Sequence, residues 1–197
     1  MAHDPPPTKV TVLISGEGSN LQALIDASSS LMPYLRIVRV ISNKAGANGL
    51  NRAKAASIPT TYHNLVAGKY HKPGEKDPNV IKEARERYDA DLASLILKDS
   101  PDLVALPGKY DGTRAIERAY DDYHKGKLEH DTTGIMVHYV ISEVDRGTPI
   151  VVRQVKCKTP ETLDELKNRM HQEEHQLIKE GTQMAIHNLW EERAKSG

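Results

Sequence analysis

The sequence predicts an α/β fold in which a wound, mostly parallel sheet is followed by an antiparallel hairpin and a long C-terminal helix. Apolar, β-branched runs at residues 10–14 and 35–41 alternate with helical patterns, and this alternation is typical of a parallel sheet. The first run is almost continuously apolar, so it is predicted to be a central strand covered on both faces. The chain of 197 residues is long enough to bury most of its apolar surface. We expect one domain over residues 10–197, after a disordered lead-in at residues 1–9 that contains three consecutive prolines.

Composition indicates a small-molecule partner. The 27 basic and 27 acidic side chains cancel, so the net charge favours neither nucleic acid nor an anionic membrane. No apolar stretch approaches the length of a transmembrane helix or the core of a signal peptide. Cys157 is the single cysteine, which excludes an internal disulfide, and a cytoplasmic location is predicted. This thiol lies in a strand pattern without a base nearby in the sequence, so we interpret it as a packing residue rather than a nucleophile.

The first strand ends in a glycine-rich turn that leads into a helix. Gly16 and Gly18 allow a sharp turn and a close approach of the backbone to a ligand. Ser19 and Gln22 have the spacing of a capping box, so the helix is predicted to begin at Ser19 or Asn20. Unpaired N–H groups and the positive end of the helix dipole favour an anion there, and a phosphate fits this geometry.

Two common phosphate loops fit this turn poorly. A dinucleotide fingerprint requires a small residue where Leu21 stands, and an acidic residue after the second strand, where Ser-Asn-Lys is found at residues 42–44. A Walker loop requires Gly-Lys-Ser/Thr, which the sequence lacks. Neither NAD binding nor ATP hydrolysis is therefore expected. A tight strand-to-helix turn that binds no ligand is the alternative.

The next elements follow in order to a fourth strand. A short helical stretch at residues 45–57 and a weak strand at residues 59–63 complete a β-α-β-α-β order. Asp77 and Pro78 are a helix cap and a first-turn proline, and they start a long amphipathic helix. The fourth strand is predicted at residues 102–106.

The last part of the chain is predicted to contain helix, hairpin and helix. Thr113 is expected to cap a helix, and residues 134–141 and 148–157 alternate as two strands of an antiparallel hairpin at the sheet edge. Thr159 is expected to cap the last helix, whose apolar stripe is interrupted only by Glu174. An acid on a buried stripe requires a partner.

The last helix also carries two histidines at the spacing of a zinc helix. His171 and His175 lie four residues apart, but Gln172 stands where a zinc protease needs its Glu base. No third ligand is evident, so no metal site is predicted.

Several motifs, in order along the chain, resemble one family, the phosphoribosylglycinamide formyltransferases of purine synthesis. They are ISGEGSNLQALI at residues 14–25, ISNKA at 41–45, RERYD at 85–89, PDLV at 101–104, GIMVHY at 134–139, EVDRG at 143–147 and EH at 174–175. The resemblance extends over nearly the whole chain and is strongest to the fungal members. It implies the Rossmann-like formyltransferase fold.

The resemblance also implies the reaction and its ligands. The amine of 5'-phosphoribosylglycinamide would attack the formyl carbon of 10-formyltetrahydrofolate, the cosubstrate, without a metal. Gly18, Ser19 and Asn20 match the substrate phosphate loop, and Glu174 matches a Glu that contacts the ribose hydroxyls. Arg85 matches an Arg on the folate side of the site. From the pattern alone, a solvated helix charge explains Arg85 equally well.

The catalytic residues are only partly matched. Asp145 stands where the resemblance places an acid that holds the catalytic His and helps to move a proton, although an Asp before Arg-Gly is also ordinary turn chemistry. His138 matches a further family His, or is a hydrogen-bonded core residue. The family's Asn-x-His-Pro segment, which supplies the catalytic Asn and His, has no match before Leu-Pro-Gly at residues 106–108. Roughly thirty residues are absent there, about one crossover unit.

Three interpretations of this departure stay open. The chain is a formyltransferase with impaired activity, a sugar-phosphate-binding or regulatory protein of the same fold, or a shortened version of an ordinary enzyme. The sequence indicates no oligomeric state.

Overall fold

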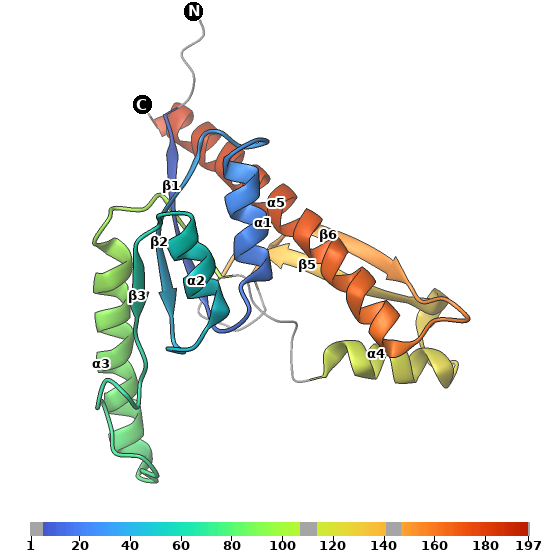
Figure 1. Ribbon diagram of the computed structural model, residues 1–197, viewed down its shortest axis with the longest axis horizontal. Coiled ribbons are helices and arrows are strands. Elements are labelled where there is room, and N and C mark those ends of the chain that lie inside the picture. Colours follow the sequence, from blue (N-terminus) through green and yellow to red (C-terminus); the bar gives the residue numbers. More distant parts are fainter. Residues whose placement is uncertain (1–5, 107–113, 141–146, 197) are drawn as a thin grey trace, which may run out of the picture. The chain divides into compact units, whose positions relative to one another are not determined.

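The computed structural model describes residues 6–106, 114–140 and 147–196 (Figure 1). The chain divides into two compact units, Met1–Pro107 and Gly108–Gly197, which are described in turn. The single domain over residues 10–197 stays a prediction.

The first unit is built on a parallel sheet. Its strands are β1 (Thr8–Ile14), β2 (Leu35–Ser42), β3 (Thr60–Tyr62) and β4 (Leu103–Ala105), in the spatial order β3-β2-β1-β4. All pairs are parallel, and β1 lies between β2 and β4, as predicted for a strand covered on both faces. Val10 and Val12 are accordingly 1% and 0% exposed. The strand begins at Thr8, inside the range that was predicted as a lead-in.

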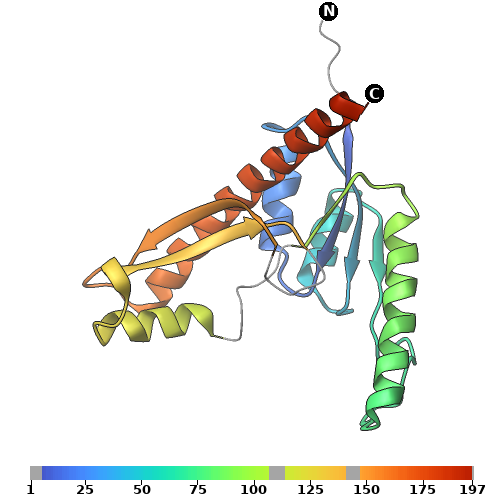
Figure 2. The same ribbon diagram turned by 180° about the vertical axis from the view of Figure 1, so that it is seen from behind.

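Helices α1 (Ser19–Ser28), α2 (Asn48–Ala55) and α3 (Pro78–Leu97) complete this unit. α1 contacts α2, and both contact β2, while α3 runs alongside β3 (Figures 1 and 2). Leu21 and Leu24 are fully buried on α1, and burying one such side chain contributes about 1.5–3 kcal/mol. The predicted cap of α3 is confirmed, because the Asp77 carboxylate accepts a hydrogen bond from Asn79 N at 2.9 Å.

The connection between β3 and α3 is attached to the helix by aromatic residues. The His63 ring stacks on Tyr88 with the ring centroids 4.3 Å apart, and Tyr70 meets Tyr88 edge-on. The Tyr70 hydroxyl donates to Asp91 at 2.5 Å, and this hydrogen bond to a carboxylate raises the pKa of Tyr70 to about 12. The connection is therefore held against α3 at this point.

The second unit contains α4 (Ala115–His124), η1 (Glu129–Asp131), β5 (Thr132–His138), β6 (Pro149–Lys156) and α5 (Leu163–Ser196). β5 and β6 pair antiparallel, which confirms the predicted hairpin. Within the described residues the hairpin is a two-stranded sheet of its own and not an edge of the first sheet, because its hydrogen-bonded ladder joins β5 only to β6.

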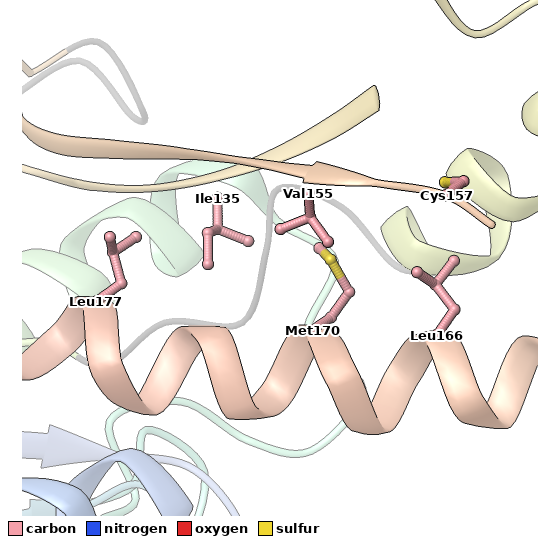
Figure 3. Packing of buried hydrophobic residues seen from close by; sticks show 6 residues of the cluster. All are labelled: Ile135, Val155, Cys157, Leu166, Met170 and Leu177. Carbon is pink, nitrogen blue, oxygen red and sulfur yellow. The ribbon is translucent and has the colours of Figure 1, made fainter. Parts of the chain in front are cut away.

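The core of this unit lies between the hairpin and α5. Figure 3 shows Leu166, Met170 and Leu177 pointing from α5 toward Ile135 and Val155 of the hairpin. Leu166 is fully buried, so the predicted apolar stripe of the last helix is confirmed. Cys157 is 3% exposed in the same cluster.

Two predicted caps require comment. The prediction that Thr159 caps the last helix is wrong, because α5 begins at Leu163. Thr162 N donates to Glu165 Oε2 at 2.7 Å and Glu165 N donates to Thr162 Oγ1 at 3.3 Å, a reciprocal capping box that satisfies the first donors of the helix. The predicted cap at Thr113 lies outside the described residues.

Candidate functional site

The glycine turn after β1 has the backbone that the sequence predicts for an anion site. Gly18 precedes α1 with φ 72° and ψ 29°, the left-handed region in which a side chain is strained. A Cβ at Gly18 would also lie 2.5 Å from Gly49 Cα. Glycine is therefore required at this position for two separate reasons, one conformational and one steric.

The start of α1 has no side-chain cap within the described residues and no acidic residue in its first turn. The first backbone hydrogen bond of the helix runs from Gln22 N to Gly18 O at 2.9 Å. The N–H groups before Gln22 have no intrahelical partner, because no carbonyl precedes them in the helix. Ser19 and Asn20 belong to this first turn, so their N–H groups are available to an anion.

The capping box predicted from Ser19 and Gln22 is wrong. Gly18 is the capping residue, and the Gln22 side chain is engaged elsewhere: its Nε2 donates to Asp26 Oδ1 at 2.8 Å and its Oε1 accepts from Arg52 at 3.4 Å. The predicted helix start at Ser19 is nevertheless correct.

Asn20 adds a polar atom that requires a partner. Its Oδ1 is buried and accepts no hydrogen bond from the described part of the chain. A buried acceptor without a donor costs about 1–3 kcal/mol. A ligand that brings a hydroxyl or an N–H to this atom would recover that free energy.

Glu174 lies on α5 in the second unit, and its side chain is 16% exposed. Its Oε2 is 4.0 Å from His171 Nε2, a long contact to a histidine that is itself 56% exposed. This contact contributes little to stability. Glu174 is thus a largely buried acid on the otherwise apolar stripe of α5.

The other predicted site residues are placed as follows. Arg85 is exposed on α3 in the first unit. His138 is half-buried at the end of β5, where its Nδ1 is 2.8 Å from Tyr139 O. Asp145 lies outside the described residues. Gly18, Ser19 and Asn20 form one continuous turn, whereas Glu174 and His138 belong to the second unit.

Cys157 does not have the environment of a nucleophile. Burial raises the pKa of its thiol, and the nearby Glu161 raises it further. The thiolate is therefore disfavoured, and its position in the core cluster agrees with the packing role predicted from the sequence.

In the described residues no group of three or more His, Cys, Asp or Glu side chains could hold a metal ion. Across the same part of the chain, no helix is long and apolar enough to cross a membrane.

Sequence reasoning missed one group beside the turn. Asn48, Gly49 and Arg52, from the start of α2, contact the loop at Gly16 and Glu17. Residues 16 and 52 are too far apart for any local pattern to pair them. The only signal was a glycine at position 49, inside the predicted helix.

Comparison with known proteins identifies the family. The formyl transferase family model matches residues 8–108 and 104–182. The chain belongs to this formyl transferase family. A phosphoribosylglycinamide formyltransferase from Schizosaccharomyces pombe is 37% identical over 211 residues, covering 91% of this chain and 96% of that protein. One from Saccharomyces cerevisiae is 38% identical over 215 residues, covering 92% and 98%.

The fold is shared with solved members of the family. A crystal structure of glycinamide ribonucleotide transformylase 1 from Symbiobacterium toebii has a TM-score of 0.71 and 26% identity, and covers 88% of this chain and 85% of that chain. The predicted fold class, the mostly parallel wound sheet with a hairpin and a long last helix, is confirmed. Membership of this family makes the protein a formyltransferase, an enzyme type that uses a folate-derived formyl donor.

The comparisons also locate a break in this chain. The S. pombe alignment spans 211 residues, more than the 197 of the whole chain, so that relative contains residues without a counterpart here. The two family matches overlap at residues 104–108, so they meet at the end of β4, and we infer the break there. This is the position at which the sequence predicts an absent segment, between the strand of the first sheet and the hairpin.

Proposed function

We propose that this enzyme transfers the formyl group of 10-formyltetrahydrofolate to 5'-phosphoribosylglycinamide in de novo purine biosynthesis. One observation carries the proposal. A helix start with a left-handed glycine as its N-cap and no side-chain cap is suited to a phosphate. It occurs in a chain that is 37% identical to a phosphoribosylglycinamide formyltransferase over 96% of that protein.

The substrate phosphate would bind at the turn after β1. The N–H groups of Ser19 and Asn20 and the helix dipole would stabilise its charge, and Gly18 would let the backbone approach it closely. Glu174, a largely buried acid on α5, would accept hydrogen bonds from the ribose hydroxyls, the role that the resemblance implies for a Glu at this position.

The formyl donor is proposed to bind on the side of the site to which Arg85 contributes. In the reaction, the glycinamide nitrogen forms a bond to the formyl carbon, and a tetrahedral oxyanion results. The bond from that carbon to N10 of the folate then breaks, while the proton lost by the amine reaches N10. Asp145 is the residue proposed to assist this proton transfer.

The break after β4 leads us to expect slow turnover. The resemblance assigns the oxyanion donors, an Asn and a His, to the segment that has no counterpart here. Losing one oxyanion donor typically costs about 10² to 10³ in rate, and losing a general acid or base about 10² to 10⁴. We therefore expect formyl transfer far below the typical enzyme value of about ten per second.

Calorimetric titration with phosphoribosylglycinamide tests the binding part of this proposal. Saturable binding is expected. Ser19→Ala and Asn20→Ala keep the backbone N–H groups but remove a polar side chain at the start of α1, so each should weaken binding. Absence of binding to folded protein, or unchanged affinity in Gly18→Val, would contradict the proposed site.

A spectrophotometric assay with a 10-formyl folate tests the chemistry. A rate constant near ten per second, the typical enzyme value, would contradict the expected impairment. Inserting a strand and loop with Asn-x-His-Pro before Leu106 should raise the rate. Failure of that insertion in a folded, substrate-binding protein would mean that the defect lies elsewhere.

The alternative function is binding of the sugar phosphate without turnover, and the assays above also test it. Substrate affinity together with no measurable transfer, even with saturating folate, would support this alternative. A cytoplasmic location is part of the main proposal, and microscopy of a fluorescent fusion would test it.

A further inference from the structure

The proposed phosphate loop contains an acid, Glu17, between its two glycines. A carboxylate this close to a phosphate would repel it, and the turn has no basic residue of its own between Ile14 and Leu21 to compensate. The loop would therefore bind an anion poorly unless another part of the unit neutralises this charge.

Two side chains from α2 hold that carboxylate. Glu17 Oε1 accepts hydrogen bonds from Asn48 Nδ2 at 2.6 Å and from Arg52 Nη2 at 3.3 Å. Asn48 and Arg52 are four residues apart, so they lie on the same face of the helix. Both hydrogen bonds lower the pKa of Glu17, with the larger effect from Asn48. The acid is thus ionised and already paired.

Arg52 also fixes the backbone of the loop. Its Nε donates to the Glu17 carbonyl at 3.0 Å, and its Nη1 donates to Gln22 Oε1 at 3.4 Å. The guanidinium therefore joins the loop, the first turn of α1 and α2 through a single planar group. A lysine could not make these contacts together, because its single ammonium lacks the forked geometry.

A pair of glycines brings α2 close enough for these contacts. Gly49 N donates to Gly16 O at 3.2 Å, and a Cβ at Gly49 would lie 3.1 Å from Gly18 Cα and 2.5 Å from Ile14 Cδ1. Gly49 thus permits the close approach of α2 to the loop. At that distance the side chains of Asn48 and Arg52 reach Glu17.

We propose that Arg52, assisted by Asn48, is a positioning residue for phosphate binding, because it neutralises Glu17 and holds that carboxylate away from the anion site. The inference rests on the proposed function, since it assumes that the substrate phosphate binds at this loop. Arg52 acts through Glu17 and is not itself assigned a contact with the substrate.

The test is a double-mutant cycle read by calorimetry with 5'-phosphoribosylglycinamide. Arg52→Ala leaves the Glu17 carboxylate without its cation. The affinity of this variant for 5'-phosphoribosylglycinamide should fall about tenfold or more, the scale of a hydrogen bond to a charged group. Adding Glu17→Gln to that variant should restore most of the lost affinity, because the repelling charge is gone. Glu17→Gln alone completes the cycle.

Lys54→Ala is the matched control. Lys54 is an exposed cation on the same helix, so its removal changes the net charge equally. We expect its affinity to stay close to that of the unsubstituted chain. Thermal melts of all variants identify any loss of folded protein, and Arg52→Gln replaces Arg52→Ala if the latter does not fold.

The outcomes are distinct. If the unsubstituted chain does not bind the substrate, the proposed function fails. If it binds and Arg52→Ala binds equally well, or Lys54→Ala weakens binding as much, the inference is overturned. It is also overturned if the double variant is as weak as Arg52→Ala, because Arg52 would then not act through the Glu17 charge.

Discussion

Gly18→Ala is the substitution whose effect the structure constrains most closely. Two costs apply at this position, and each can be given a magnitude. Gly18 has φ +72°, and a residue with a Cβ pays about 1–2 kcal/mol in the left-handed region. The added Cβ would also lie 2.5 Å from Gly49 Cα, a backbone atom that cannot rotate away. Forcing an atom into a packed site costs about 1–3 kcal/mol.

Gly74→Ala provides the control that separates these costs. Gly74 belongs to the same unit and has φ +79°, but a Cβ there would meet nothing within 4 Å. Gly74→Ala should therefore lose only the conformational part, about 1–2 kcal/mol, whereas Gly18→Ala should lose about 2–5 kcal/mol in total. The gain from restricting the unfolded chain is the same for both and cancels in the comparison.

Urea unfolding followed by far-ultraviolet circular dichroism measures both variants. The free energy of unfolding should fall further in Gly18→Ala than in Gly74→Ala, by about 1–3 kcal/mol, with similar slopes against urea. Equal losses in the two variants would refute the close approach of the loop to α2. Calorimetry on the same samples should show weakened substrate binding only in Gly18→Ala.

Three further predictions concern the second unit. Glu174→Gln should weaken substrate binding by about tenfold, the effect of one hydrogen bond to a charged group, with a nearly unchanged melting temperature; a large melting shift with intact binding would make Glu174 structural. Arg169 donates two hydrogen bonds to Glu161, at 2.9 and 2.7 Å, and they lower the pKa of the Glu161 carboxyl in the folded protein. The pair therefore stabilises the fold fully at pH values above the unfolded pKa of Glu161. This stabilisation is lost as the pH falls through the lower pKa of the folded state. Glu161→Gln should cost about 1.5–3 kcal/mol in urea unfolding at neutral pH and progressively less in acid, and a cost independent of pH would contradict this ion pair. Gly181→Ala places a Cβ 2.8 Å from Val137 Cβ. The overpacking should cost about 1–3 kcal/mol, more than the gain of about 1 kcal/mol in helix propensity, so the melting temperature should fall. A higher melting temperature would contradict the close packing of α5 on β5.

Periodicity predicted the elements well because the buried side of a helix or strand must be apolar at regular intervals along the whole element. The run at residues 10–14 was identified as central, and β1 indeed lies between β2 and β4. The stripe that includes Leu166 and Met170 does face the hairpin. These predictions succeed because apolar spacing fixes which face must be covered, whatever the covering element is.

The capping residues of α1 and α5 were predicted wrongly, because several residues near each of these helix starts can act as caps. Thr159 and Thr162 are equally suitable by residue type, and Glu165, three residues after Thr162, makes the reciprocal hydrogen bonds that decide between them. At α1 the left-handed conformation of Gly18 makes it the capping residue in place of Ser19. Local sequence narrows such choices but does not decide them.

The group around Glu17 could not be predicted from local patterns at all. Its contacts with Asn48 and Arg52 join segments that only the parallel pairing of β1 and β2 brings to the same end of the sheet. The sequence contains every residue of this group, but the pairing depends on the register of two strands, which is a tertiary property.

The position of the break has a consequence for how binding and turnover are linked in this chain. The proposed phosphate site and its support, from Ile14 to Arg52, depend on β1, β2, α1 and α2, and all of these precede the break after β4. The oxyanion donors implied by the resemblance belong to the segment that is absent. A change confined to that segment leaves the hydrogen bonds of Arg52 and the conformation of Gly18 intact. If the phosphate binds at the proposed site, its affinity and the formyl-transfer rate depend on different stretches of the chain, and we expect the first to be retained while the second falls.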